Sequence, residues 1–165
     1  MITLQKLINA TPPDVKDRSR AVAAIIAGVS MGEKISGNVK ISTVVFTGKG
    51  RAAAEDNWWD FAIELYPTEI HSNIFSKIGP SNLAWVKCSC PFFHYYCKYA
   101  VNRTGSTTIN PDRFDSGALK PAVVKNPSSL PYLCKHLFKA QADVVRRAQE
   151  LAKRTQATTE YKFSG

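Results

Sequence analysis

The chain has 165 residues, of which 44% are hydrophobic and 21% are charged, a composition typical of an ordinary soluble globular protein. The longest apolar run, Ala21–Ala27, is too short to cross a bilayer, so we expect no membrane contact. The first residues lack a basic stretch followed by a hydrophobic one. We therefore predict no secretion signal, and expect the protein to stay in a cytoplasm or to be assembled there into something larger.

The formal net charge of +9 is distributed unevenly along the chain. Residues 1–80 carry nine Lys or Arg against eight Asp or Glu, whereas residues 81–165 carry thirteen against five. A basic C-terminal half suits an acidic partner, which the charge alone leaves as either nucleic acid or an acidic protein surface.

The first predicted element is a helix that begins near Thr11 and ends near Gly32. Thr11 is a candidate cap, Pro12 suits the first helical turn, and Asp14 favours the positive end of the helix. Apolar and small residues then recur at three- and four-residue steps, which predicts one packed face: Val15, Ser19, Val22, Ile25, Ile26 and Val29. An alternative is a docking helix that stays half-exposed until it meets a partner.

Three strands are predicted next, over residues 39–47, 59–66 and 83–88, from β-branched content and from alternation of apolar and polar residues. Gly48-Lys-Gly50 is predicted to end the first strand. Residues 70–77 suit an irregular turn or a short helix. Strands joined in sequence by turns predict an α+β fold, a small antiparallel β-meander with flanking helices.

Pro91 is predicted to start a helix that Gly105 stops. Its aromatic residues recur at helical spacing, which favours a stripe packed into the core over rings that stack on bases: Phe92, Tyr95, Tyr96 and Tyr99. Residues 104–133 form a long segment rich in Ser, Thr, Asn and Pro, and it is the best candidate for a partner-binding surface.

The last predicted helix covers residues 134–154, with one apolar face and basic residues on the others. Residues 157–165 lack periodicity and suggest an extended tail. We therefore divide the chain into an N-terminal arm and helix over 1–36, an α+β domain over 37–154, and a C-terminal tail over 155–165.

Four metal-ligand residues stand in two pairs, Cys88-Ser-Cys90 and Cys134-Lys-His136. Zinc favours four tetrahedral nitrogen or sulfur donors, and three thiolates with one histidine leave no coordination position open. A reducing compartment argues against disulfides. Cys97 and His94 compete as ligands, but such a set would leave the Cys-Lys-His pair unexplained, so Cys97 is interpreted as a small core residue. His71 stands alone and is interpreted as an ordinary histidine.

The Cys-x-Cys and Cys-x-His order, with Cys90-Pro91 after the first pair and His136-Leu137 at the second, resembles the SWIM zinc finger. The span between the pairs is longer than is usual in that family. The resemblance implies that the first pair ends a β-hairpin, that the second opens a helix, and that the module binds nucleic acid or protein. The amino-acid sequence of residues 85–140 is also similar to SWIM-like segments in structural proteins of tailed bacteriophages.

No glycine-rich phosphate loop, nucleophile elbow or paired carboxylates in a recognisable setting occurs in the sequence, so we expect a protein that is not an enzyme. Two functions remain open. One is a zinc-stabilised structural protein of a tailed-phage virion that contacts other virion proteins through its loops and termini. The other is a SWIM module that binds nucleic acid through the basic C-terminal half.

Overall fold

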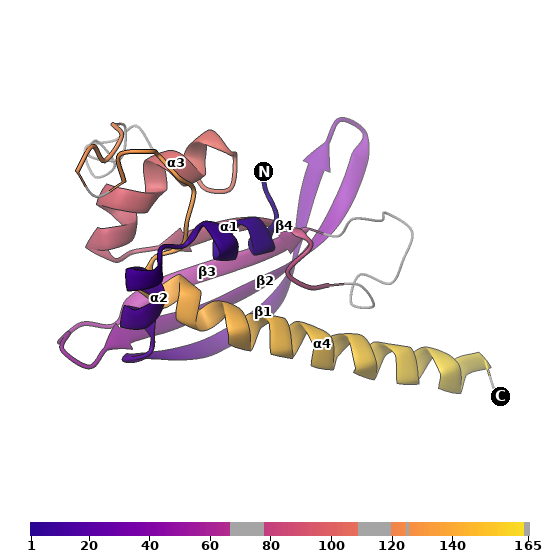
Figure 1. Cartoon of the computed structure of the whole chain (residues 1–165). Coiled ribbons are helices and arrows are strands. Elements are labelled where there is room, and N and C mark those ends of the chain that lie inside the picture. Colours follow the sequence, from indigo (N-terminus) through magenta and orange to yellow (C-terminus); the bar gives the residue numbers. More distant parts are fainter. Residues whose placement is uncertain (67–77, 109–119, 125, 164–165) are drawn as a thin grey trace.

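The computed structural model describes residues 1–66, 78–108, 120–124 and 126–163, with the backbone alone at residues 36, 152 and 155–163. Four strands form one antiparallel sheet in chain order, and helices α1, α2 and α4 lie on the same side of it (Figure 1). The predicted α+β meander with flanking helices is confirmed, with one strand more than expected. The strands are β1 (Val22–Ser36), β2 (Val39–Ala52), β3 (Trp59–Tyr66) and β4 (Leu83–Cys88).

The N-terminal residues are part of the folded core. Helix α1 (Leu4–Ala10) buries Leu4 and Leu7 completely, and Thr3 caps it by accepting a hydrogen bond from the Lys6 backbone N–H. The Ala84 N–H donates to the Ile2 carbonyl, which joins this segment to β4. Residues 1–10 are thereby fixed to the edge of the sheet that β4 forms.

Thr11 has a different role from the predicted cap. Helix α2 (Pro13–Ser19) has Pro12 at its N-cap position and no side-chain cap. The buried Thr11 hydroxyl instead donates to the Leu7 carbonyl and accepts from the Leu133 N–H. It thus joins α1 to the segment that leads into the last helix.

The prediction of one helix from Thr11 to Gly32 is wrong beyond Ser19. Residues 22–36 form strand β1, which pairs with β2 along its whole length and has a β-bulge between Ile26 and Gly28. A short apolar run does not by itself distinguish a strand from a buried helix. Gly28 and Gly32 disfavour a helix interior, and the β-branched residues favour a strand.

Strand β2 also continues where the sequence suggested a break. Gly48 and Gly50 pair with β1 on one side and with β3 on the other, up to Ala52. A Cβ atom on Gly48 would lie 2.1 Å from the Ile25 carbonyl oxygen and 2.6 Å from the Phe61 ring. This glycine therefore permits a close approach of neighbouring chains rather than a turn.

Strands β3 and β4 match the predicted ranges, and their register places one apolar face toward the helices. Ile63 pairs with Val86 and Leu65 with Ala84, and all four are completely buried. Phe46 and Val44 of β2 continue this face. We call it the core face of the sheet; α1, α2 and α4 supply the opposing side of the core.

The segment after Cys90 is helical, but of the four aromatic residues in the predicted core stripe only Phe92 packs against the core, and it is partly buried. A π-helical turn covers Phe93–Cys97, and α3 follows over Lys98–Arg103. The wider π turn shifts the spacing of the buried face, so that Phe93, Cys97 and Val101 are completely buried while Tyr95 is 55% exposed. Gly105, with φ of +74°, lies just beyond the helix end, as predicted.

Helix α4 (Lys135–Phe163) runs along the core face and is longer than predicted. Four residues of its predicted apolar face are buried, and Leu151 is half-buried: Leu137, Ala140, Val144 and Ala148. Residues 157–163 continue the helix instead of forming an extended tail. Neither proline nor glycine interrupts them, and each added residue extends an existing helix at little cost.

Some predictions fall outside the described residues: the turn or helix at 70–77, His71, and the middle of the long loop at 109–119. Within the part of the chain that the structure describes, no helix is both long enough and apolar enough to span a membrane.

Candidate metal centre

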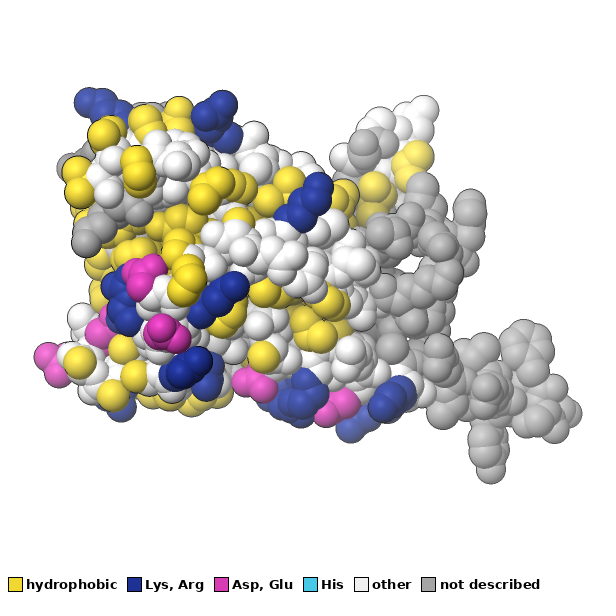
Figure 2. Space-filling view, viewed as in Figure 1, with side chains coloured by type: hydrophobic (Ala, Val, Ile, Leu, Met, Phe, Trp, Pro, Cys, Tyr) yellow, Lys and Arg dark blue, Asp and Glu magenta, His cyan; other side chains and the backbone are white. Residues whose placement is uncertain are grey.

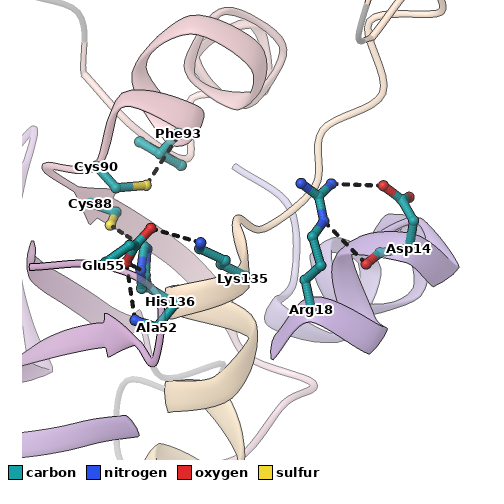
Figure 3. Close-up of polar contacts among 9 residues, drawn as sticks. All are labelled: Asp14, Arg18, Ala52, Glu55, Cys88, Cys90, Phe93, Lys135 and His136. Carbon is teal, nitrogen blue, oxygen red and sulfur yellow. Dashed lines mark hydrogen bonds and ion pairs between the residues drawn. The ribbon is translucent and has the colours of Figure 1, made fainter. Parts of the chain in front are cut away.

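The first ligand pair is positioned by the end of β4. Cys88 is the last residue of the strand and lies opposite Phe61, with its side chain on the core face. Ser89 extends the pairing, because its N–H donates to the Asp60 carbonyl and its hydroxyl accepts from the Asp60 N–H, both at 2.9 Å. Cys90 follows, and its sulfur accepts a hydrogen bond from the Phe93 N–H at 3.3 Å (Figure 3). The intervening serine thus fixes the two thiols in place.

The second pair is positioned by the start of α4. Cys134 directly precedes the helix, and its carbonyl accepts a hydrogen bond from the Phe138 N–H at 2.8 Å. His136 lies in the first turn. The N-terminus of a long helix carries a partial positive charge, which stabilises thiolates placed beside it.

These two pairs meet in one buried cluster. The ligand atoms of Cys88, Cys90, Cys134 and His136 all lie within 4.8 Å of one another. The Cys88 sulfur and His136 Nδ1 are 4.0 Å apart, and a tetrahedral zinc site would hold its donor atoms about 3.6–3.8 Å apart. The arrangement is therefore close to what a four-coordinate metal ion requires.

The cluster is closed to solvent. Cys88 is 5% exposed, Cys90 is 1% exposed, and Cys134 and His136 are not exposed at all. A cavity of about 180 Å³ lies beside it, with Cys90 and His136 in its wall together with Trp59 and Phe92. Two of the four residues thus border a cavity, although almost none of their own surface is exposed.

Glu55 orients the histidine from outside the cluster. His136 Nε2 lies 3.0 Å from one carboxylate oxygen, which also accepts a hydrogen bond from the Ala52 N–H at 3.0 Å. The other oxygen lies 2.7 Å from Lys135 Nζ (Figure 3). Because an ionised carboxylate only accepts, Nε2 carries a proton, and Nδ1 is the nitrogen that can bind a metal.

The charges around Glu55 keep it ionised. Burial raises the pKa of its carboxyl group, but hydrogen bonds from Lys135, from the Ala52 backbone and from His136 outweigh this and lower the pKa to about 2. The negative Glu55 and positive Lys135 largely balance each other next to the cluster.

The three thiols compete for ionisation. Hydrogen bonds from Cys134 and then Cys88 lower the pKa of Cys90 far below its ordinary value. Burial, followed by its hydrogen bonds with Cys88 and Cys90, raises the pKa of Cys134. A divalent cation would allow all three thiols to ionise together. Its positive charge would stabilise the thiolates in place of the water that burial removes.

The alternative ligands lie outside the cluster. Cys97 is completely buried, and burial raises the pKa of its thiol, so it stays neutral as a small core residue, as predicted. Among the described residues, neither Cys97 nor His94 belongs to the group of possible metal ligands. The local set Cys88, Cys90, His94 and Cys97 is therefore not assembled.

Sequence reasoning missed the residues that support the ligands. Glu55 lies in the polar connection between β2 and β3, where nothing in the sequence distinguishes it from Asp56. Gly50 leaves room for the histidine, because a Cβ atom there would lie 3.1 Å from His136 Cβ and 3.2 Å from Cδ2. Only the pairing of β1, β2 and β3 brings these positions to the start of α4.

Replacing Glu55 with Gln is expected to weaken metal affinity about 10- to 100-fold, because outer carboxylates tune the basicity and orientation of a ligating histidine. Competition against a chelator, with zinc as the metal, measures the change. Glu33→Gln is the matched control, since Glu33 forms an exposed ion pair with Lys40 far from the cluster. Equal affinities for the two variants would show that Glu55 does not support the site.

Comparisons of the chain with protein-family models, with curated proteins and with solved structures give no match.

Proposed function

We propose that this chain is a non-enzymatic, zinc-binding structural protein of a tailed-phage virion. The observation that carries the proposal is the closed cluster of three cysteines and one histidine where β4 ends and α4 begins. This placement supports the resemblance to the SWIM zinc finger, in which a hairpin end and a helix start supply the two pairs. Three thiolates and an imidazole favour zinc among the common metals.

In this proposal the metal has a mechanical role. It joins the end of the sheet to the start of the longest helix, and it closes the chain between Cys90 and Cys134. Such a bond holds the base of the 104–133 segment in place. A domain held in this way suits a subunit that must stay folded inside an assembly.

Exposed apolar residues on the described part of the loop support a role in subunit contacts. Val123 is 74% exposed and Val124 is 86% exposed, and both line a groove of about 420 Å³ with Tyr95 and Tyr96. Adjacent apolar side chains that remain in solvent often mark a protein-interaction site.

Particle incorporation tests this proposal. We expect mass spectrometry to find the chain in purified particles. Two variants should lose incorporation into particles but keep their zinc. One has serine at positions 123 and 124 and a glycine-serine linker in place of residues 109–119, and the other is truncated after Gln156. The replacement spares Ser106, whose carbonyl accepts from the Val86 N–H and whose hydroxyl accepts from the Ile2 N–H. Particles without the chain, or normal incorporation of both variants, would contradict the proposal.

The second candidate is a nucleic-acid-binding SWIM module, and basic side chains along α4 favour it (Figure 2). They include Lys139, Arg146, Arg147, Lys153 and Arg154. A protein that grips phosphates releases counterions, so its affinity falls steeply with salt. Two results together would favour this candidate over the first. One is sub-micromolar, strongly salt-dependent binding of DNA or RNA near physiological salt, and the other is normal incorporation of the loop and truncation variants.

A further inference from the structure

A groove lies between strand β1 and helix α4, on the side of the sheet that faces the helices. It has a volume of about 280 Å³, and Val29 of β1 and Leu151 of α4 supply its apolar part. Arg146, Arg147 and Arg154 line it from the helix, against a single acidic residue, Glu150. The groove therefore combines an apolar surface with an excess of positive charge.

The apolar surface continues along β1 beyond the groove. Val29 pairs with Phe46 and Met31 pairs with Val44, so all four side chains lie on the core face of the sheet. Phe46 and Val44 are buried, yet Val29 is 40% exposed and Met31 is 50% exposed. Ile35, further along the same face, is 73% exposed, and Glu33, which forms an exposed ion pair with Lys40, lies between Met31 and Ile35 on that face. Together, Val29, Met31 and Ile35 form what we call the arm stripe.

The arm stripe begins on the edge strand of the sheet and ends, at Ile35, where the sheet narrows to two strands. β3 pairs with β2 only between Val44 and Gly50, and Val29 and Met31 lie opposite that stretch, so only residues 32–43 extend past β3 as a β1–β2 ribbon. In Figure 1 this ribbon rises away from the sheet while α4 runs on below it. The helix that covers the first half of β1 thus leaves the second half uncovered. A two-stranded ribbon alone is only marginally stable in water, so a partner that covers the stripe would stabilise it.

The arginines indicate what kind of partner fits. Arg146 already contacts Glu150 at 2.8 Å and Asp143 at 3.5 Å. Arg147 has no ion-pair partner among the residues that the structure describes. The groove lining thus carries more positive than negative charge, and opposite charges across an interface select the partner.

We propose that the groove and the arm stripe bind an acidic amphipathic segment of another protein subunit. Its apolar side chains would cover the arm stripe, and an Asp or Glu side chain would pair with Arg147. A second copy of this chain fits poorly, because each copy has a net charge of +9. Nucleic acid would neutralise the arginines but leave the stripe in water. The inference rests on the proposed function only in taking the partner to be a protein.

Peptide binding tests the proposal. Two of the probes are fluorescently labelled helical peptides of equal length with the same leucine stripe. One peptide has glutamates on its polar face and the other has lysines. The third probe is a labelled DNA duplex. In anisotropy titrations of the zinc-loaded chain, we expect the acidic peptide to bind at least about tenfold more tightly than the lysine peptide. Arg147→Glu should weaken that binding about tenfold or more, while Arg147→Lys should keep most of it.

Matched variants separate the apolar part from the charge. Met31→Ser with Ile35→Ser should weaken the acidic peptide about tenfold, whereas Ile25→Ser should change little, because Ile25 is exposed on the opposite face of the same strand. Lys87→Glu, on β4, makes the same charge change as Arg147→Glu away from the groove. Equal binding of the two peptides, or equal effects of Arg147→Glu and Lys87→Glu, would overturn the proposal.

Two other results would replace the occupant. Tighter binding of the duplex, unaffected by serine at positions 31 and 35, would make this a polyanion surface. Dimers of the wild-type chain that disappear in the Met31→Ser, Ile35→Ser variant would make it a self-association surface. These readouts are independent of particle incorporation, so the proposed function and this inference can fail separately.

Discussion

Cys134→Ser is expected to abolish zinc binding and to unfold the C-terminal half of the domain. Cys134 contributes one of the four buried donors and directly precedes α4. Structural zinc in small fingers contributes roughly 10–16 kcal/mol of apparent binding free energy that is coupled to folding. Loss of a ligand removes most of that free energy and leaves the remaining thiols clustered without a cation. Thermal unfolding and metal analysis of the purified variant measure both effects, and His136→Ala should behave in the same way.

Cys97→Ser is the control for this prediction. Cys97 is as completely buried as Cys134, but it lies outside the ligand cluster. Burying a hydroxyl there costs about 1–3 kcal/mol, and the zinc content should stay at one equivalent. If the two serine variants lost the same stability and the same zinc, the fourth ligand would have been assigned wrongly.

Gly48→Ala should be the most destabilising glycine substitution in the sheet. The added Cβ would meet the Ile25 carbonyl, which is backbone and paired within the sheet, so β1 or β2 must move. Overpacking of this kind costs about 3 kcal/mol and occasionally more. Gly79→Ala is the control, since a Cβ there meets no atom of the described residues within 4 Å. Urea unfolding of both variants makes the comparison, and equal midpoints would mean that the Gly48 contact is not rigid.

The cluster of three cysteines and one histidine could be predicted from sequence because it depends on short, local patterns. Cys-x-Cys and Cys-x-His give pairs of donors whose spacing suits metal binding whatever fold surrounds them. Strands β3 and β4 could be predicted equally well, since their apolar residues alternate along a half-buried surface.

What the sequence did not reveal depends on partners that are distant along the chain. Residues 22–36 have an apolar pattern that a helix would also satisfy, and only the pairing with β2 decides for a strand. Gly48 resembles a turn residue until β1 and β3 are placed on either side of it. Glu55 becomes important only when the start of α4 lies beside the β2–β3 connection. The π-helical turn at 93–97 changes which aromatic residues point inward, and its wider spacing has no clear sequence signal.

Metal–ligand distances test the central claim most directly. X-ray absorption at the zinc edge of the purified, zinc-loaded chain should give three sulfur atoms at about 2.3 Å and one nitrogen at about 2.1 Å from a single zinc ion. Less than half an equivalent of zinc after purification, or a zinc ion bound mainly by oxygen, would contradict it.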